Sequence, residues 1–282
     1  MKVFHAQSQL SQYLQPLKQA LQTIGFVPTM GALHKGHLSL LQQALSENDV
    51  TVVSIFVNPT QFNNAEDLAK YPRTLDRDVA LLETLSDKII VYAPSVDDIY
   101  EGNTVAKSFD YDGLDNEMEG SNRPGHFNGV GTIVKKLFEI VQPNNAYFGE
   151  KDFQQLQIIR KMVAKNMMDI NVIGCPIYRE ANGLAMSSRN ERLSAQAKEK
   201  AAVIYKTLQT AKKLFVEKDI VQAEQFVKET FANEADFDLE YFVIADEVSL
   251  KTATQKTAHT KYRAFIVVHV EGIRLIDNIA LN

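Results

Sequence analysis

The sequence predicts an α/β fold, in which a Rossmann-like, doubly wound parallel sheet is followed by a smaller α+β domain. Two observations predict it. Short apolar runs alternate with stretches of helical periodicity up to about residue 175, which is typical of a parallel sheet with helices on both faces. After Arg192 the alternation stops, and two charged helical stretches precede three strand-like segments. We place the boundary near Ile177, so that residues 1–177 and 178–282 form the two domains.

The strands of the first domain are predicted from apolar and β-branched runs at residues 24–27, 50–57, 88–92, 145–148 and 170–174. Helical periodicity predicts helices at residues 38–45, 74–85, 129–141 and about 152–165, and Pro143 ends the third of them. Ligands of such sheets bind beyond the carboxyl ends of the strands. Polar motifs lie there in this chain, after Val27, Val57 and Phe148 and near Tyr178.

The second domain is predicted from helical stretches at residues 195–217 and 221–231, followed by strand-like segments at 239–245, 262–270 and 274–281. Helices followed by strands, without alternation of the two, indicate a separate α+β domain. The chain has 282 residues, of which 45% are hydrophobic, so each domain can bury a core of its own.

Charge and cysteine content limit the functions open to the chain. The net charge of −5 is mild and dispersed, which argues against a nucleic-acid surface but not against a local site for ATP. The single cysteine, Cys175, stands in an apolar run and is predicted to be a small core residue rather than a nucleophile. One cysteine excludes an internal disulfide and is typical of a reducing compartment. Because we find neither a signal peptide nor a stretch of transmembrane length, we expect a cytoplasmic protein without a membrane partner.

The most informative segment is residues 28–37, Pro-Thr-Met-Gly-Ala-Leu-His-Lys-Gly-His, between a predicted strand and a predicted helix. Such a turn offers backbone N–H groups and the positive end of a helix dipole, both of which attract phosphate. His34 and His37 add donors that can carry positive charge. The pair could instead be polar surface residues or half of a metal site, although no third ligand follows at the spacing that a metal needs. His-x-Gly-His at this place resembles the phosphate-binding signature of the nucleotidyltransferase superfamily, whose members attack the α-phosphate of a nucleoside triphosphate.

Four further motifs follow at residues 57–62 (Val-Asn-Pro-Thr-Gln-Phe), 123–130 (Arg-Pro-Gly-His-Phe-Asn-Gly-Val), 149–155 (Gly-Glu-Lys-Asp-Phe-Gln-Gln) and 186–190 (Met-Ser-Ser-Arg-Asn). Taken singly, each is equally typical of a turn, a solvated helix start or a loop. Their order, after the 28–37 motif and at the ends of predicted strands, resembles the pantothenate synthetase (pantoate–β-alanine ligase) family. The resemblance is specific over about residues 25–193 and looser beyond, where it rests on domain size and on the order of helices and strands.

The resemblance implies which residues bind ATP. His34 and His37 would contact the phosphates, with His37 as proton donor, and Lys151 would reach a phosphate. These three residues and Arg189 form the implied catalytic set, and residues 186–189 would be a second phosphate clamp. Asp152 would contact the ribose. The implied ATP site as a whole comprises Met30, Gly31, Ala32, Leu33, His34, Lys35, Gly36, His37, Gly149, Glu150, Lys151, Asp152, Tyr178, Met186, Ser187, Ser188 and Arg189.

The resemblance also implies the sites of the other two substrates. Gln61 would touch both pantoate and β-alanine, and Gln155 would bind pantoate. Met30 and Phe62 would form apolar walls for the dimethyl carbon of pantoate, and His126 belongs to the same implied substrate-binding set.

The implied reaction has two steps. A pantoate carboxylate attacks the α-phosphate of ATP, and the amine of β-alanine then attacks the resulting acyl adenylate to give pantothenate and AMP. Mg²⁺ is expected with ATP, and Asp78 is a candidate to help bind it, directly or through water. The second domain is a candidate lid, and the family resemblance implies a homodimer through the first domain. Two positions depart from the family pattern, namely Tyr178, where a small apolar residue is expected near adenine, and Asn182, which replaces a common acidic residue.

Two other functions stay open at this point. One is a different nucleotidyltransferase, which would transfer AMP or CMP to a phosphorylated alcohol or to phosphopantetheine and would have no need for both Gln61 and Gln155. The other is a non-catalytic nucleotide-binding protein, which the presence of His34, His37 and Lys151 argues against.

Overall fold

The computed structural model describes all residues, Met1–Asn282, and they fold into two compact units. Unit 1 comprises Met1–Glu150 and Gln154–Pro176, and unit 2 comprises Lys151–Phe153 and Ile177–Asn282. The chain therefore enters unit 2 twice, first for three residues of the 149–155 motif and then from Ile177 onward. The motif is divided between the units, because Lys151 belongs to unit 2 and Gln155 to unit 1.

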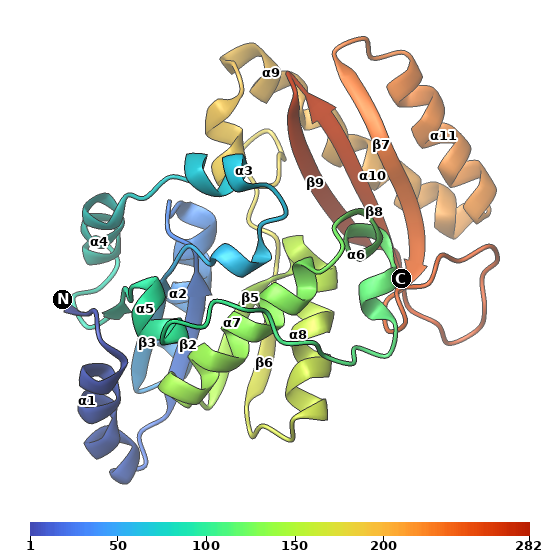
Figure 1. Ribbon diagram of the computed structural model, residues 1–282. Coiled ribbons are helices and arrows are strands. Elements are labelled where there is room, and N and C mark those ends of the chain that lie inside the picture. The colour runs from blue at the N-terminus through green and yellow to red at the C-terminus, as the bar shows by residue number, and fades with distance from the viewer. The chain divides into compact units, whose positions relative to one another are not determined.

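The sheet of unit 1 has six strands, and all its neighbouring pairs are parallel (Figure 1). The strands are β1 (Lys2–Phe4), β2 (Ile24–Thr29), β3 (Val50–Ile55), β4 (Ile90–Tyr92), β5 (Asn145–Gly149) and β6 (Asn171–Cys175). Their order, β1-β4-β3-β2-β5-β6, confirms the predicted Rossmann-like sheet. The strand order reverses direction between β2 and β5, and this switch point is where ligands of such sheets bind.

Helices cover both faces of this sheet. Successive side chains of a strand point to opposite faces. The Phe26 ring of β2 packs edge-on against Phe138, with 6.2 Å between ring centroids, whereas the next residue, Val27, lies in a cluster with Leu41 and Ala44. The helices are α1 (Gln7–Gln19), α2 (Lys35–Glu47), α3 (Ala65–Lys70), α4 (Leu75–Glu83), α5 (Val96–Tyr100), α6 (Met118–Asn122), α7 (His126–Val141) and α8 (Phe153–Lys165), with 3-10 turns η1 (Pro59–Gln61), η2 (Leu114–Asn116) and η3 (Glu150–Asp152).

Unit 2 is the predicted α+β arrangement. Strands β7 (Phe237–Asp246), β8 (Tyr262–Val270) and β9 (Ile273–Ala280) form an antiparallel sheet in the order β7-β8-β9. The 3-10 turn η4 (Ser188–Arg192) precedes α9 (Ala195–Lys200), α10 (Ala202–Glu217) and α11 (Ile220–Ala232). Alternate residues of β8, such as Ile266 and Val268, lie in one core cluster with Leu208 and Ala211 of α10. The helices therefore cover one face of this sheet.

Besides the short helices α3, α5 and α6, which were not predicted, two features of the fold differ from the sequence predictions. β1 and α1 were not predicted, because β1 has only three residues and α1 contains Pro16 and buries only Leu10 and Leu14. The single helix predicted at 195–217 is wrong, since Ala201 separates α9 from α10. At that residue the backbone N–H is shared between the carbonyls of Ala197 and Glu199, a tightened turn that no proline or glycine marks. None of the helices combines the length and the hydrophobicity that crossing a membrane requires.

Candidate active site

The turn after β2 is shaped by one glycine and one buried carboxylate. Gly31 has φ +84°, and a Cβ placed there would lie 3.0 Å from Asp78 Oδ2, so glycine is required at this position. The Asp78 side chain is buried and accepts hydrogen bonds from the backbone N–H groups of Ala32 (3.0 Å) and Leu33 (2.8 Å) and from the Thr74 hydroxyl (3.2 Å). Asp78 therefore holds the 28–37 motif in place from the first turn of α4.

The two histidines of this turn have a defined tautomer. His34 is the N-cap of α2, where its Nδ1 accepts from the Gly36 N–H (3.1 Å), and His37 Nδ1 accepts from the His34 N–H (3.2 Å). The rings lie 4.0 Å apart, centroid to centroid. An Nδ1 that accepts a hydrogen bond leaves the ring proton on Nε2. Both neutral imidazoles thus present an Nε2–H donor at a helix N-terminus, which suits phosphate oxygens.

The Gln61 side chain is held by Asn58. Asn58 is 1% exposed, and its Nδ2 donates to Gln61 Oε1 (3.0 Å) and to the Gly129 carbonyl (3.2 Å). The hydroxyls of Tyr100 (2.6 Å) and Thr60 (3.1 Å) donate to Asn58 Oδ1, which fixes the orientation of its amide. With its oxygen occupied, Gln61 directs Nε2 to the Met30 sulfur at 3.1 Å.

The Arg-Pro-Gly-His segment, residues 123–126, supports the turn that carries Gln61. Its His126 lies 65 residues further along the chain than Gln61. His126 Nδ1 donates to the Gln61 carbonyl (2.8 Å), so its Nε2 accepts from Arg123 Nη1 (3.2 Å). Gly129 lies so close to η1 that a Cβ there would be 2.2 Å from the Thr60 carbonyl oxygen. The structure thus gives His126 a part in placing Gln61, and its predicted contact with substrate stays a prediction.

Two adjacent glutamines of α8 have opposite environments. Gln154 is buried, donates to the carbonyls of Leu114 (2.9 Å) and Glu117 (2.8 Å), and accepts from the Glu119 N–H (3.0 Å). The Gln155 amide is half-buried and makes no hydrogen bond within the chain. Gln154 is therefore a structural residue, while Gln155 keeps its donors and acceptor for a ligand.

In unit 2, the backbone of Lys151 is anchored to β9. Asn278 Nδ2 donates to the Lys151 carbonyl (2.9 Å), and Asn278 Oδ1 accepts from Arg263 Nη1 (2.7 Å). The Arg263 guanidinium also stacks on Phe153, 3.9 Å from the ring centroid. The Lys151 ammonium itself has no hydrogen-bond or ion-pair partner in the structure.

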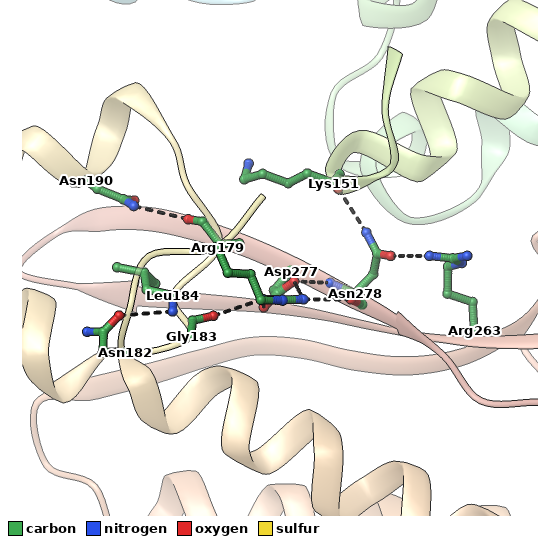
Figure 2. A network of polar contacts seen from close by, with 10 residues as sticks. Lys151, Arg179, Asn182, Gly183, Leu184, Asn190, Arg263, Asp277 and Asn278 are labelled. Carbon is green, nitrogen blue, oxygen red and sulfur yellow. Dashed lines mark hydrogen bonds and ion pairs between the residues drawn. The ribbon is translucent and has the colours of Figure 1, made fainter. Parts of the chain in front are cut away.

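The 186–190 motif is anchored to the same strand (Figure 2). Asp277 forms a bidentate ion pair with Arg179, at 2.7 and 2.9 Å, and Arg179 Nη1 also donates to the Gly183 carbonyl (3.1 Å). The Met186 N–H donates to the Tyr178 carbonyl (3.0 Å), which uses the backbone acceptor of Tyr178 within unit 2.

The far end of the motif is fixed by the buried Asn190, whose Nδ2 donates to Glu180 Oε1 (3.0 Å) and to the Ala185 carbonyl (3.1 Å). Ser187 caps η4 through its hydroxyl, and the Arg189 guanidinium is exposed without a carboxylate partner. Lys151, Ser187, Asn190 and Asp277 line one hollow of unit 2.

The predicted site residues thus fall into two groups. Unit 1 brings together the 28–37 motif, Gln61 and His126. Unit 2 brings Lys151 and Ser187 to one hollow. Of the other predicted residues, Phe62 follows η1 and packs edge-on against Tyr71, Gly149 ends β5, Glu150 begins η3, Lys35 begins α2, and Asp152 is exposed.

Sequence reasoning missed the residues that hold the site. Asn58 lies within a quoted motif, but its Asn-Pro pair is equally typical of a turn. Asp277 and Asn278 carried one signal, because two adjacent polar residues in a mostly apolar strand call for buried partners. Cys175 is buried, and its burial raises the pKa of the thiol to about 12, which confirms the prediction of a core residue.

Comparison with known proteins agrees with this arrangement. A family model described as Pantoate-beta-alanine ligase matches residues 2–280. Pantothenate synthetase of Flavobacterium psychrophilum is 62% identical over 281 residues, and that of Christiangramia forsetii is 52% identical over 282, each covering 100% of both chains. The crystal structure of pantothenate synthetase from Thermus thermophilus has a TM-score of 0.90 at 38% identity and covers 100% of this chain and 99% of its own. Pantoate-beta-alanine ligase from Francisella tularensis, solved in complex with Beta-gamma ATP and Beta-alanine, has a TM-score of 0.80 at 37% identity and covers 100% and 98%.

Proposed function

The chain belongs to the pantoate-beta-alanine ligase family, and from this premise we propose that it joins pantoate to β-alanine with ATP, through a pantoyl adenylate, giving pantothenate, AMP and diphosphate. The structural observation that supports this most directly is the pair of Nε2–H donors on His34 and His37 at the N-terminus of α2. It lies at the switch point of the sheet, where imidazole donors and a helix N-terminus both favour a triphosphate.

In the first step, a carboxylate oxygen of pantoate bonds to the α-phosphorus of ATP, and the bond from that phosphorus to the bridging oxygen breaks to release diphosphate. His34 and His37 donate to phosphate oxygens as their charge increases. Gln155 binds the hydroxyl or carboxylate groups of pantoate, and Gln61 does so from the other motif. Met30 and Phe62 contact its apolar dimethyl carbon.

Unit 2 supplies the positive charge for the phosphates. Lys151 and Arg189 make no direct ion pair, so binding an anion does not require them to break one. The hydroxyls of Ser187 and Ser188 add donors that rotate to suit the ligand. We assign these four residues to the ATP phosphates, and we assign the segment near Tyr178 to adenine.

In the second step, the uncharged amine of β-alanine attacks the acyl carbon of the adenylate. The bond from that carbon to the AMP oxygen breaks, AMP leaves, and the amine loses a proton. No protein nucleophile takes part, in keeping with the buried, weakly acidic Cys175 thiol. Gln61 contacts β-alanine at this stage, and exclusion of water protects the adenylate from hydrolysis.

Mg²⁺ enters as part of the substrate, MgATP, where it neutralises phosphate charge. The chain has no cluster of three His, Cys, Asp or Glu side chains that would hold the ion by itself. Asp78 already accepts three hydrogen bonds. We therefore assign it first to support of the 28–37 turn and only second to binding Mg²⁺. We further propose a homodimer, a cytoplasmic location, and a lid role for unit 2.

Isotope exchange tests the reaction. With pantoate and MgATP but no β-alanine, label from diphosphate should be incorporated into ATP. The first step does not need β-alanine, and its reversal forms ATP from the adenylate and diphosphate. Adding β-alanine should convert the intermediate to AMP and pantothenate, identified by mass. Exchange that occurs without pantoate would indicate another nucleotidyltransferase, and exchange that requires β-alanine would refute the two-step order. No exchange in any mixture would indicate a nucleotide-binding protein without this activity.

A further inference from the structure

Two adjacent residues of β9 hold both phosphate-binding segments of unit 2. Asp277 and Asn278 are 5% and 1% exposed, and as neighbours on a strand they point to opposite faces. Figure 2 shows Asp277 directed to Arg179 and Asn278 placed between Lys151 and Arg263. A strand that needed only to pack would carry apolar side chains here.

The Asn278 amide is fixed in one orientation. Its Oδ1 accepts from the Arg263 guanidinium, which can only donate, so Nδ2 is directed to the Lys151 carbonyl. This bond joins residues 127 apart in the sequence and holds η3, the turn from which the Lys151 ammonium extends.

Asp277 fixes the other segment through Arg179. The guanidinium is held by both carboxylate oxygens, by the Gly183 carbonyl and by the face of Tyr205, 3.6 Å from the ring centroid. Arg179 and Ala185 are paired across the same hairpin, which leads directly into Met186 and Ser187. Both segments then line one hollow, to which Lys151 and Ser187 each contribute.

We propose that Asp277 and Asn278 are positioning residues, which set the placement of Lys151 relative to Ser187 and Arg189 for the adenylation step. The proposal rests on the proposed function, in that Lys151 and Ser187 bind the phosphates of ATP. Neither Asp277 nor Asn278 needs to touch a substrate. Misplacement of a reacting or binding group by about 1 Å can cost about a hundredfold in rate.

The test uses Asn278→Asp in the full chain. The carboxylate still accepts from Arg263 but cannot donate to the Lys151 carbonyl, so one bond is lost without a change in size. We expect pantoate-dependent diphosphate exchange to fall about 10- to 100-fold, with the KM for pantoate unchanged and thermal unfolding still cooperative but at a lower temperature, because a carboxylate is added beside the buried Asp277. Asn278→Ser removes the same bond without adding charge and serves if Asn278→Asp fails to fold. Glu247→Gln is the matched control, because Glu247 contacts Arg263 Nε (2.8 Å) and neither segment, and it should keep normal exchange.

A second measurement separates positioning from general damage. Lys151 is labelled with an amine-reactive reagent and the labelling is followed by mass spectrometry with increasing MgATP. ATP should protect Lys151 in the wild type, and protection in Asn278→Asp should require several times more ATP. If ATP fails to protect the wild type, the phosphate role of Lys151 is wrong. If it protects both chains equally and exchange is normal in Asn278→Asp, the positioning role is overturned.

Discussion

Side chains of unit 1 and unit 2 that are assigned to the same reaction are held in opposite ways. In unit 1, the side chains of His34, His37 and Gln61 each accept a hydrogen bond from a neighbouring residue of the same turn. In unit 2, the Lys151 ammonium and the Arg189 guanidinium make none, and only the backbone beneath them is anchored.

The difference follows from what each group must do. An imidazole or an amide has two ends, so one end can be tied to the protein and the other directed to the ligand. An ammonium has donors only, and a carboxylate partner would compete with the phosphate. The side chains of unit 1 are thus oriented by their own hydrogen bonds. In unit 2 the side-chain cations stay available for the ligand, and their positions are set by the anchored backbone.

The largest effect should come from a cation of unit 2. Lys151→Met keeps the length of the side chain and removes its charge, so we expect pantoate-dependent diphosphate exchange to fall about 100- to 1,000-fold. Thermal unfolding should change only slightly, because the ammonium makes no hydrogen bond or direct ion pair and acts on the buried Asp277 carboxylate only through its charge. Lys200→Met is the control, since Lys200 pairs with Asp236 on the surface of the same unit and should leave exchange intact. Exchange near the wild-type rate in Lys151→Met would remove that residue from its role.

Unit 1 should respond differently, with stability and activity lost together. Asn58→Asp keeps the acceptor for Tyr100 but loses both donors, so that Gln61 Oε1 and the Gly129 carbonyl each lose the hydrogen bond from this side chain. Each lost hydrogen bond costs about 0.5–1.5 kcal/mol of unfolding free energy.

Urea unfolding should report this loss, and steady-state kinetics should show a higher KM for pantoate because Gln61 is no longer oriented. Asn63→Asp, at an exposed position of the same loop, is the comparison and should change neither quantity strongly. A folded Asn58→Asp of normal stability with normal kinetics would show that the Gln61 amide needs no support.

Features close together in the sequence were predicted best. The strand, turn and helix around His34 and His37 lie within one short segment, so periodicity and the two glycines placed both histidines at the end of β2. Support over long separations was not predictable. Gln61 and His126 are 65 residues apart, Arg179 and Asp277 are 98 apart, and each contact depends on where two elements meet in the fold. One sequence carries no signal for such pairs beyond a polar residue in an apolar run.

The glutamines of α8 give a smaller and sharper contrast within one helix. Gln155→Ala should weaken pantoate use by about 1–3 kcal/mol, because polar groups of the substrate lose their partner. Its stability and its affinity for ATP should be normal, since this amide bonds to nothing in the chain. Gln154→Ala should do the reverse and lower the unfolding free energy, because Gln154 joins α8 to residues 114, 117 and 119. Calorimetric titration with ATP and kinetics in pantoate test the pair, and a Gln155→Ala variant that mainly loses ATP binding would contradict the assignment.

The smallest effect should come from an ion pair of unit 2 outside the two segments that we assign to the ATP phosphates. Glu240 of β7 accepts from Arg274 Nε (2.8 Å) and Nη2 (2.9 Å) on β9 and from His269 Nε2 (2.7 Å) on β8. The hydrogen bonds from Arg274, with a lesser contribution from His269, hold the pKa of the Glu240 carboxyl below its ordinary value despite partial burial. A lowered pKa means that the stabilisation is present above the unfolded-state pKa and is lost as the pH falls through the folded-state value.

Glu240→Gln should therefore cost less than about 1 kcal/mol at neutral pH, because the pair is partly exposed to solvent and salt. The difference between variant and wild type in unfolding free energy should shrink with added salt and disappear in acid below the carboxyl range. Diphosphate exchange should be unchanged, unlike that of Asn278→Asp on the same sheet. Unit 2 would then contain one polar cluster that affects only stability and another that also sets the rate. A large loss of exchange in Glu240→Gln would mean that the whole sheet, and not the pair on β9, positions Lys151.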